Sequence, residues 1–273
     1  MKSRRGLVLE EMGLTPVWRL RESVAAPAAM SEVAADQPPP SATRDAPPIA
    51  ARPSPAMIVQ SRVTSHESRL PGQSDRRTAI MSMVWPELKA RVAGCTDCPL
   101  HQKRTKTVFG VGDENADWMF VGEGPGAEED AKGEPFVGQA GRLLDNVLAA
   151  ISIKRGSGVY IANCVKCRPP GNRNPEPGEA LQCEPYLHRQ IELIRPKLIV
   201  ALGRVAAQNL LATDASIASL RGRLHRYRDT PLIVTYHPAY LLRSLPDKAK
   251  AWEDLCFAVR AMQDLQRGAS APN

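Results

Sequence analysis

The chain has 273 residues, a formal net charge of +7 and a sequence pI of about 9.2. This length suits one well-packed core with an additional segment, and the basic excess permits nucleic-acid binding without establishing it, because a phosphate-binding surface must gather its cations on one face. No stretch of eighteen apolar residues occurs, and Glu10 and Glu11 interrupt the first apolar run before it reaches signal-peptide length. We therefore expect a cytosolic, cytoplasmic protein without a membrane span.

The first 80 residues differ from the rest in composition. Alanine, proline, serine and arginine dominate from Ala25 to Arg77, with few large apolar side chains to bury. Such a segment cannot offset the entropy of ordering, so residues 1–80 are predicted to be disordered. Within them, residues 6–21 have the pattern of a short amphipathic helix, which either docks on an unidentified protein partner or, as we favour, forms a frayed terminus. The folded domain is expected at 81–268, followed by a flexible tail at 269–273.

Six cysteines are spaced in a way that suggests a metal site. They stand at positions 95, 98, 164, 167, 183 and 256. Disulfides are rare in the cytosol, so Cys95 and Cys98 are interpreted as half of a four-thiolate site. Either Cys164 with Cys167 or Cys167 with Cys183 completes it. Cys164 is expected inside a strand, as a small buried hydrophobe, which favours Cys183, and spacing does not separate zinc from an iron–sulfur cluster.

The chain is organised around a predicted strand at 118–121 and the loop that follows it. Glycines alternate at positions 122, 124 and 126, and four carboxylates crowd the same loop, among them Glu123 and Glu129. The last glycine of a dinucleotide-binding loop and the lysine of a phosphate-binding loop are missing, and the carboxylates would repel a pyrophosphate. Glycine lets the backbone approach a bound group closely, so we expect a site for another kind of ligand in preference to an ordinary strand-to-helix turn.

Predicted strands and helices alternate along the chain. The strands are expected at 118–121, 158–165, 197–202 and 232–235, and the helices at 140–151, 179–194, 204–211 and 247–265, the last with Cys256 in the core. This alternation predicts an α/β fold with a central four-stranded parallel sheet. Parallel strands end at one edge of a sheet, so the loop at 122–130, Asn163 and His237 are expected to form one pocket.

Two features at those strand ends suggest a nucleobase as the ligand. Asn163 in an apolar strand is either satisfied by backbone or faces a ligand, and its amide offers an acceptor and two donors that match the imide edge of a pyrimidine. Further on, Leu241, Leu242 and Arg243 combine two large apolar side chains, expected to be exposed, with a cation. This combination is typical of a wedge that enters a base stack while the arginine neutralises phosphate.

Four segments, together with the cysteine spacing, resemble a known family. They are GEGPGAEED (122–130), PFVGQAGRLL (135–144), NCVKCRPPGNRNP (163–175) and HPAYLLR (237–243). They are similar to the family 4 uracil-DNA glycosylases, the iron–sulfur type, over about residues 83–265. The resemblance implies a three-layer α/β/α fold and a monomer. It also implies a monofunctional hydrolase that removes flipped uracil from single- or double-stranded DNA and leaves an abasic site, at the start of base excision repair.

The resemblance further implies roles for individual residues. The 4Fe-4S ligands would be Cys95, Cys98, Cys167 and Cys183, the uracil-binding residues Glu123, Gly124, Pro125, Glu129, Phe136, Asn163 and His237, and the DNA-binding residues Leu241, Leu242 and Arg243. Phe136 is expected to stack on the base, Asn163 to read O4 and N3–H, and Glu129 to exclude the thymine methyl group. His237 is expected to hydrogen-bond O2 as the uracil anion leaves.

The group that activates water is left open. Gly124 stands where the better-known family 1 enzymes place an aspartate, which makes Glu123 a candidate catalytic residue beside His237 and Asn163. Covalent capture is not expected, since the basic loop that carries the reactive histidine of a related type is missing between Phe136 and Asn163. Two other interpretations are a non-catalytic nucleic-acid-binding or replication-associated metal-cluster protein, and a zinc ribbon built on Cys95, Cys98, Cys164 and Cys167.

Overall fold

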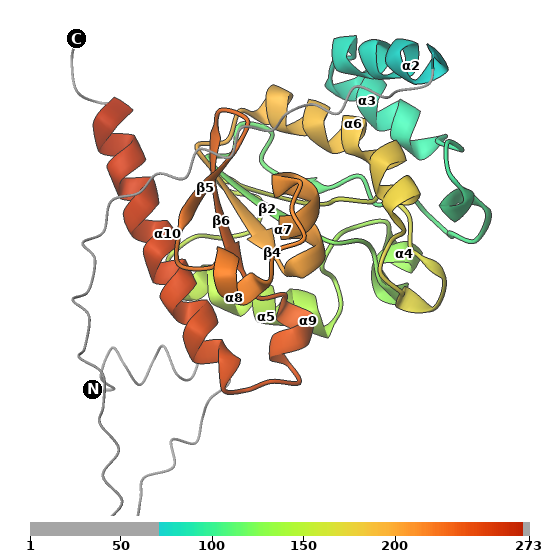
Figure 1. Ribbon diagram of the computed structural model, residues 1–273. Coiled ribbons are helices and arrows are strands. Elements are labelled where there is room, and N and C mark those ends of the chain that lie inside the picture. The colour runs from blue at the N-terminus through green and yellow to red at the C-terminus, as the bar shows by residue number, and fades with distance from the viewer. Residues whose placement is uncertain (1–70, 270–273) are drawn as a thin grey trace, which may run out of the picture.

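The computed structural model describes residues 71–269 (Figure 1). The expected disorder of residues 1–70, the expected helix at 6–21 and the tail at 270–273 lie outside the described residues. Within the described part, the chain forms a six-stranded sheet in the order β1-β3-β2-β4-β6-β5. The strands are β1 (Val111–Gly112), β2 (Trp118–Gly122), β3 (Val159–Asn163), β4 (Leu198–Leu202), β5 (Leu224–Tyr227) and β6 (Thr230–Thr235).

The four central strands are those that the sequence predicted. β3, β2, β4 and β6 pair in parallel, with Phe120 opposite both Ile161 and Val200. Beyond the four predicted strands, β1 and β5 add an antiparallel strand at each edge of the sheet. Hydrophobic patterning misses both edges, since β1 has two residues and β5 alternates exposed and partly buried side chains. The α/β class and the parallel centre are confirmed.

Helices cover both faces of the sheet and give the expected three layers (Figure 1). They are α2 (Pro71–Ser82), α3 (Trp85–Ala93), α4 (Ala127–Lys132), α5 (Gln139–Ala150), α6 (Pro177–Ile194), α7 (Arg204–Leu211), α8 (Ile217–Leu220), α9 (Pro238–Leu241) and α10 (Asp247–Ala269). Leu144 of α5 and Met262 of α10 pack on the sheet face that includes Phe120. Ile191 of α6 and Leu210 of α7 pack on the opposite face. Because both faces are covered, the central strands are apolar on both sides.

The sequence predicted that the folded domain begins at residue 81, but the domain begins earlier, with helix α2. Helix α2 packs against α6, and its Ile80 is 1% exposed. Arg76 of α2 donates hydrogen bonds to the Asp97 carboxylate at 2.9 Å and to the Gln182 carbonyl at 2.7 Å. Composition misses this helix because the contacts that hold it come from residues distant in sequence, and tertiary context overrides local preference. No helix within residues 71–269 is long and apolar enough to cross a membrane.

Candidate active site and cysteine cavity

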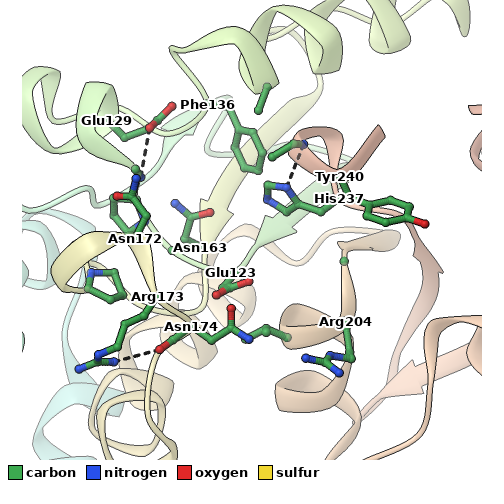
Figure 2. Close-up of a pocket in the computed structure, with 18 of the residues that line it drawn as sticks. Glu123, Glu129, Phe136, Asn163, Asn172, Arg173, Asn174, Arg204, His237 and Tyr240 are labelled. Carbon is green, nitrogen blue, oxygen red and sulfur yellow. Dashed lines mark hydrogen bonds between the residues drawn. The ribbon is translucent and has the colours of Figure 1, made fainter. Parts of the chain in front are cut away.

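A pocket of about 480 Å³ opens at the carboxyl ends of the parallel strands (Figure 2). Its walls come from the loop after β2, the end of β3, the start of α7 and the segment after β6. The predicted site residues that line it are Glu123, Gly124, Pro125, Glu129, Phe136, Asn163, His237 and Arg243. Residues far apart along the chain thus meet in one cavity, whose volume suits a small ligand.

Asn163 presents the most informative atom of the pocket. The residue is 2% exposed, and its Oδ1 has no hydrogen-bond partner among the described residues. A Cβ added to Gly122 would lie 2.5 Å from this oxygen and 2.6 Å from the Phe136 ring, so glycine at the end of β2 is what lets both side chains approach. Leaving a buried acceptor unpaired costs about 1–3 kcal/mol. Of the two interpretations of Asn163, the structure therefore favours the one in which it faces a ligand.

Phe136 and His237 face each other in the same pocket. Their ring centroids are 5.6 Å apart, and the rings are tilted by 31°. Phe136 lies on the loop between α4 and α5, whereas His237 immediately precedes α9. Figure 2 shows both rings, Asn163 and Glu123 around one space. The three predicted residues lie close enough to contact a single small planar ring.

The hydrogen bond at the start of α9 fixes the tautomer of His237. The Ala239 backbone N–H donates to His237 Nδ1 at 3.1 Å. A neutral ring whose Nδ1 accepts has its proton on Nε2, so Nε2 is a donor. Burial and the charge of Arg243 lower the pKa of His237 to about 4, although the Glu129 carboxylate opposes the shift. His237 is therefore a neutral hydrogen-bond donor at neutral pH.

Two opposing influences act on the carboxyl group of Glu123. Burial raises its pKa above the ordinary value, while the positive charge of Arg204, at the start of α7, lowers it. The backbone of Glu123 is fixed, because its carbonyl accepts a hydrogen bond from the Val165 N–H at 3.1 Å. A partly buried carboxyl group with a raised pKa, placed in a pocket, is a candidate for holding or accepting a proton.

Glu129 uses its carboxylate to hold the surrounding loops. Its Oε1 accepts hydrogen bonds from the N–H groups of Val137 at 2.9 Å and Gly138 at 3.1 Å, and its Oε2 accepts one from Gly126 at 3.1 Å. These bonds connect the start of α4 to the loop that contains Phe136. Because Glu129 also lines the pocket, it contributes a wall with a fixed position.

Sequence reasoning missed the residues that complete the pocket wall. Among them are Pro169, Asn172, Arg173, Asn174, Arg204 and Tyr240. Four of these belong to the loop before α6, where Arg173 donates hydrogen bonds of 2.7 and 2.8 Å to the buried Glu179. The signal in the sequence is the proline-rich composition of this loop with its two arginines. Its proximity to the other strand ends depends on the fold and cannot be read from composition.

The segment after β6 corrects one prediction. Leu241 is 4% exposed and packs with Leu143 and Val147 of α5. The expectation of two exposed leucines is therefore wrong for Leu241, because residues 238–241 form the short helix α9, which turns this side chain into the core. Leu242 and Tyr240 are 40% and 38% exposed and remain at the surface.

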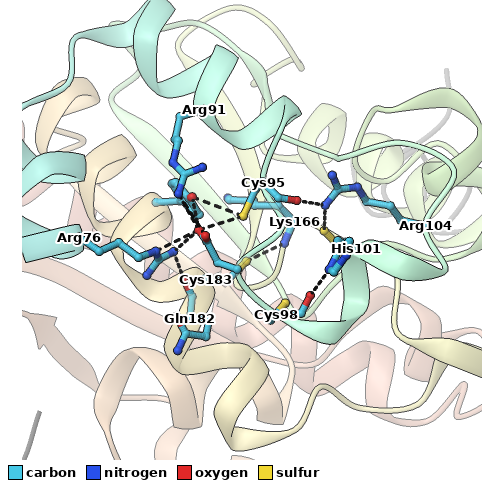
Figure 3. A network of polar contacts seen from close by, with 12 residues as sticks. Arg76, Arg91, Cys95, Cys98, His101, Arg104, Lys166, Gln182 and Cys183 are labelled. Atoms are coloured by element: carbon cyan, nitrogen blue, oxygen red, sulfur yellow. Dashed lines mark hydrogen bonds and ion pairs between the residues drawn. The ribbon is translucent and has the colours of Figure 1, made fainter. Parts of the chain in front are cut away.

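Four cysteines line a second, much smaller cavity, and Figure 3 shows three of them, Cys95, Cys98 and Cys183, near one another. Those that line it are Cys95, Cys98, Cys167 and Cys183. Cys164 lies just beyond the end of β3 and packs in a different cluster, with Met119 and Val121. The four cysteines of the zinc-ribbon interpretation, which include Cys164, therefore do not share a cavity. The alternative four, which include Cys183, do share one. Cys256 is only half-buried, so the expectation that it belongs to the core is wrong.

Polar groups of the protein already donate to three of these sulfurs. Arg104 Nη1 lies 3.1 Å from Cys167 Sγ, and the Lys166 backbone N–H lies 3.4 Å from Cys183 Sγ. The Tyr186 hydroxyl lies 3.4 Å from the Sγ of the third cysteine, at position 95. Burial raises the pKa of Cys183 to about 12, so its thiol stays protonated unless a cation binds it as thiolate. Donors aimed at buried sulfur are expected around bound thiolates.

Asp97 lines this cavity and also binds side chains of α2 and α3. Its carboxylate accepts hydrogen bonds from Arg76 at 2.9 Å, Tyr186 at 2.8 Å and Arg91 at 3.1 Å. Burial by itself would raise the pKa of Asp97, but hydrogen bonds from Tyr186 and Cys95 and the charge of Arg76 lower it to about 2. The ionised carboxylate therefore fixes the segment between the first two cysteines.

The four cysteines that line this cavity are the number and type of ligand that a 4Fe-4S cluster takes. Within residues 71–269, no three His, Cys, Asp or Glu side chains converge closely enough to hold one metal ion. In a four-iron cluster each thiolate binds a different iron atom, so the sulfurs surround the group without meeting at one point. The four thiols around one buried cavity match that requirement.

Comparisons with known proteins agree with the site. A family model described as the uracil DNA glycosylase superfamily matches residues 109–256. The chain is 46% identical over 164 residues to the type-4 uracil-DNA glycosylase of Archaeoglobus fulgidus, a match that covers 57% of this chain and 82% of that protein. It is 48% identical over 156 residues to the Thermotoga maritima protein of the same name, covering 56% of this chain and 81% of that protein. The chain thus belongs to the uracil DNA glycosylase superfamily, among its type-4 members.

Proposed function

We propose that the protein is a uracil-DNA glycosylase, which takes up a uracil flipped out of DNA and hydrolyses its N-glycosidic bond. One observation carries the proposal: the buried Oδ1 of Asn163 has no partner within residues 71–269 and lies beside Phe136, which in turn faces His237. Uracil N3–H is a donor of the kind that this oxygen lacks. Membership of the superfamily supports the same activity.

Base recognition follows from the chemistry of Asn163 and Phe136. The amide accepts from uracil N3–H and donates to O4, whereas cytosine presents an acceptor at N3 and a donor at the adjacent position, so both contacts would be mismatched. The Phe136 ring offers a face on which the flipped base stacks. Glu129 fills the space beside C5 and excludes the thymine methyl group, and its three backbone hydrogen bonds keep that wall in place.

His237 stabilises the leaving group. When the bond between C1′ and N1 breaks, the electron pair stays on uracil, and the negative charge that develops at O2 needs hydrogen-bond donors. The Nε2–H of the neutral His237 ring is such a donor, because Ala239 occupies Nδ1. The backbone N–H of Gly124, in the loop that lines the pocket, supplies a second, whereas Pro125 has no N–H to donate.

Water completes the reaction at C1′ of the oxocarbenium-like sugar. Its oxygen forms the new bond to C1′, and the proton that it loses balances the charge of the departing uracil anion. Glu123 is our candidate for orienting this water and receiving the proton, because it lines the pocket and burial raises its pKa. The positive charge of Arg204 partly opposes this rise in the pKa of Glu123.

Contacts with DNA beyond the base come from the segment after β6. Leu242 is exposed and fills the gap that the flipped base leaves, while Arg243 at the pocket wall neutralises a nearby phosphate. Leu241 has no part in this wedge, because it packs in the core.

We also propose that the four cysteines around the smaller cavity bind a 4Fe-4S cluster. They are Cys95, Cys98, Cys167 and Cys183. The support comes from their shared cavity, from the donors to three of the sulfurs and from the resemblance to the iron–sulfur glycosylases. When bound, the cluster would link the segment after α3, the loop after β3 and the start of α6, and its role is structural.

The test uses an end-labelled, single-stranded oligonucleotide with one uracil, incubated with the purified full-length protein and then treated with hot alkali. We expect strand cleavage only at uracil, and none in matched oligonucleotides with thymine or cytosine. His237→Ala protein, prepared in parallel, controls for a contaminating glycosylase and should lose the activity. Binding without cleavage after alkali would overturn the proposal in favour of a non-catalytic nucleic-acid-binding protein.

A further inference from the structure

The backbone of Phe136 is held in a conformation that aromatic residues avoid. Its φ is 54°, in the left-handed region. Such a conformation costs on the order of 1–3 kcal/mol and persists only where the surrounding structure enforces it. The ring of this residue forms part of the proposed uracil pocket, so whatever enforces the backbone conformation also sets the position of the ring.

Arg155, on the turn after α5, enforces it from outside the pocket. Its Nη2 donates to the Phe136 carbonyl at 2.9 Å, and its Nη1 donates to the Pro135 carbonyl at 3.0 Å. Its Nε donates to Asp145 on α5 at 2.9 Å, which orients the guanidinium group. A guanidinium fork suits this task because several donors in one plane reach adjacent acceptors together.

Gly141 provides the space in which the Phe136 carbonyl sits. A Cβ at this position would lie 1.8 Å from the Phe136 oxygen, so a larger residue cannot be accommodated without moving the loop. The loop is also held from its other end, where Glu129 accepts the N–H groups of Val137 and Gly138. Arg155 therefore clamps the carbonyls and Glu129 the amides on the two sides of one aromatic side chain.

We infer that Arg155, oriented by Asp145, is a positioning residue that fixes the Phe136 ring against the flipped base. The inference rests on the proposed glycosylase function. Arg155 is not among the residues that line the pocket, so it acts through Phe136. A misplacement of about 1 Å in a reacting complex can lower a rate by roughly a hundredfold, which makes a clamp of this kind matter for turnover.

The test compares Arg155→Ala with Arg189→Ala in the oligonucleotide assay. Arg189 is a matched control, because it also donates to a carbonyl, that of Met83, and to a carboxylate, that of Glu192, but it lies on α6 away from the pocket. We expect Arg155→Ala to lower kcat/KM by roughly ten- to a hundredfold, and Arg189→Ala to leave it unchanged within a factor of two. Equal losses in both variants would overturn the inference.

A double-mutant cycle separates positioning from general stabilisation. In a Phe136→Ala background, the further change Arg155→Ala should lower kcat/KM by less than twofold, because the ring that it positions is gone. Independent, multiplying effects would contradict the role. Arg155→Lys should recover part of the activity, since lysine offers one donor site without the fork.

Asp145→Asn tests the same clamp if Arg155→Ala does not fold. The Asp145 side chain is 48% exposed, so its replacement should leave the fold intact while loosening Arg155, with a smaller loss of kcat/KM in the same direction. No loss in a folded Asp145→Asn protein would remove Asp145 from the clamp. If the wild-type protein itself releases no uracil, the proposed function fails. If the wild-type protein is active and Arg155→Ala is equally active, only the role of Arg155 fails.

Discussion

The uracil pocket and the cysteine cavity lie on either side of residues 163–167, yet they satisfy their polar groups in opposite ways. In the pocket, Asn163 Oδ1 is buried with no partner in the described part of the chain, and His237 keeps a neutral donor. In the cysteine cavity, Arg104 and Tyr186 already donate to sulfur. The pocket therefore leaves hydrogen-bonding capacity for a substrate, whereas the cavity directs its donors toward the cysteine sulfurs, as the proposed structural cluster requires.

Lys166 connects the two regions. Its Nζ donates to the Asn163 carbonyl at 2.9 Å and to Gln190 Oε1 at 2.7 Å, while its backbone N–H donates to Cys183 Sγ. Burial lowers the pKa of this lysine to about 8, although neighbouring cysteines oppose the shift. A buried cation is tolerated where its donors are paired, so the short segment between pocket and cavity is held from both sides.

The largest expected effect is the loss of iron and stability when Cys183, but not Cys164, is replaced. We expect the wild-type protein to be brown, with broad absorbance near 400 nm, and Cys183→Ala to lose both iron and on the order of several kcal/mol of unfolding free energy, because metal binding is coupled to folding. Cys164→Ala, the matched control, should keep the colour and lose about 1 kcal/mol or less. Iron analysis and thermal unfolding check this. A colourless protein that binds zinc and loses it in Cys164→Ala would show that Cys164, and not Cys183, completes the metal site.

The substitution Asn163→Leu tests the proposed uracil pocket. Removal of the amide should lower kcat a hundredfold or more, the size expected for a lost transition-state donor. Stability should not fall, and it should rise by up to about 1–3 kcal/mol, because the unpaired Oδ1 disappears. Steady-state kinetics and chemical denaturation measure the two effects in one preparation. A variant that loses stability but keeps its turnover would show that Asn163 has a structural role instead.

Two truncations test how far the cysteine cavity depends on α2. Removing residues 1–70 should leave uracil release from a short oligonucleotide and the unfolding temperature unchanged. Removing 1–82 should cost about 2–3 kcal/mol, since the buried Ile80 and the bonds from Arg76 to Asp97 and Gln182 are lost. Denaturant melts of the two proteins give the difference. Identical stabilities would mean that α2 contributes nothing to the domain.

The smallest effect concerns pH and His237. Between pH 6.5 and about 4 the unfolded chain takes up a proton that the folded ring refuses, so protonation favours unfolding and stability falls as the pH falls through this window. His237→Gln should make that fall shallower, by on the order of 1 kcal/mol at pH 5.5. Burial also lowers the pKa of His188 to about 4. Because His188 is present in both proteins, its contribution to the pH dependence is the same in each. Parallel slopes from urea melts across the window would show that His237 titrates normally.

Much of the pocket could be predicted because parallel strands end at a common edge. That rule alone places Glu123, Asn163 and His237 together, although 114 positions separate the first from the last. The same reasoning fails for Leu241, whose apolar side chain suits a surface wedge and a core contact equally well. Which of these it forms depends on α5, against which α9 packs.

By itself, the sequence determined the four parallel strands, the class of the fold and the chemical character of the pocket, because apolar runs, turns and functional groups are local properties of the chain. Only the tertiary structure decided that Cys183 joins the cavity while Cys164 packs elsewhere, that Asn163 Oδ1 has no partner among the described residues, and that Arg155 reaches the Phe136 carbonyl. Each of these features depends on contacts between atoms of distant segments, and the packing of the fold determines those contacts.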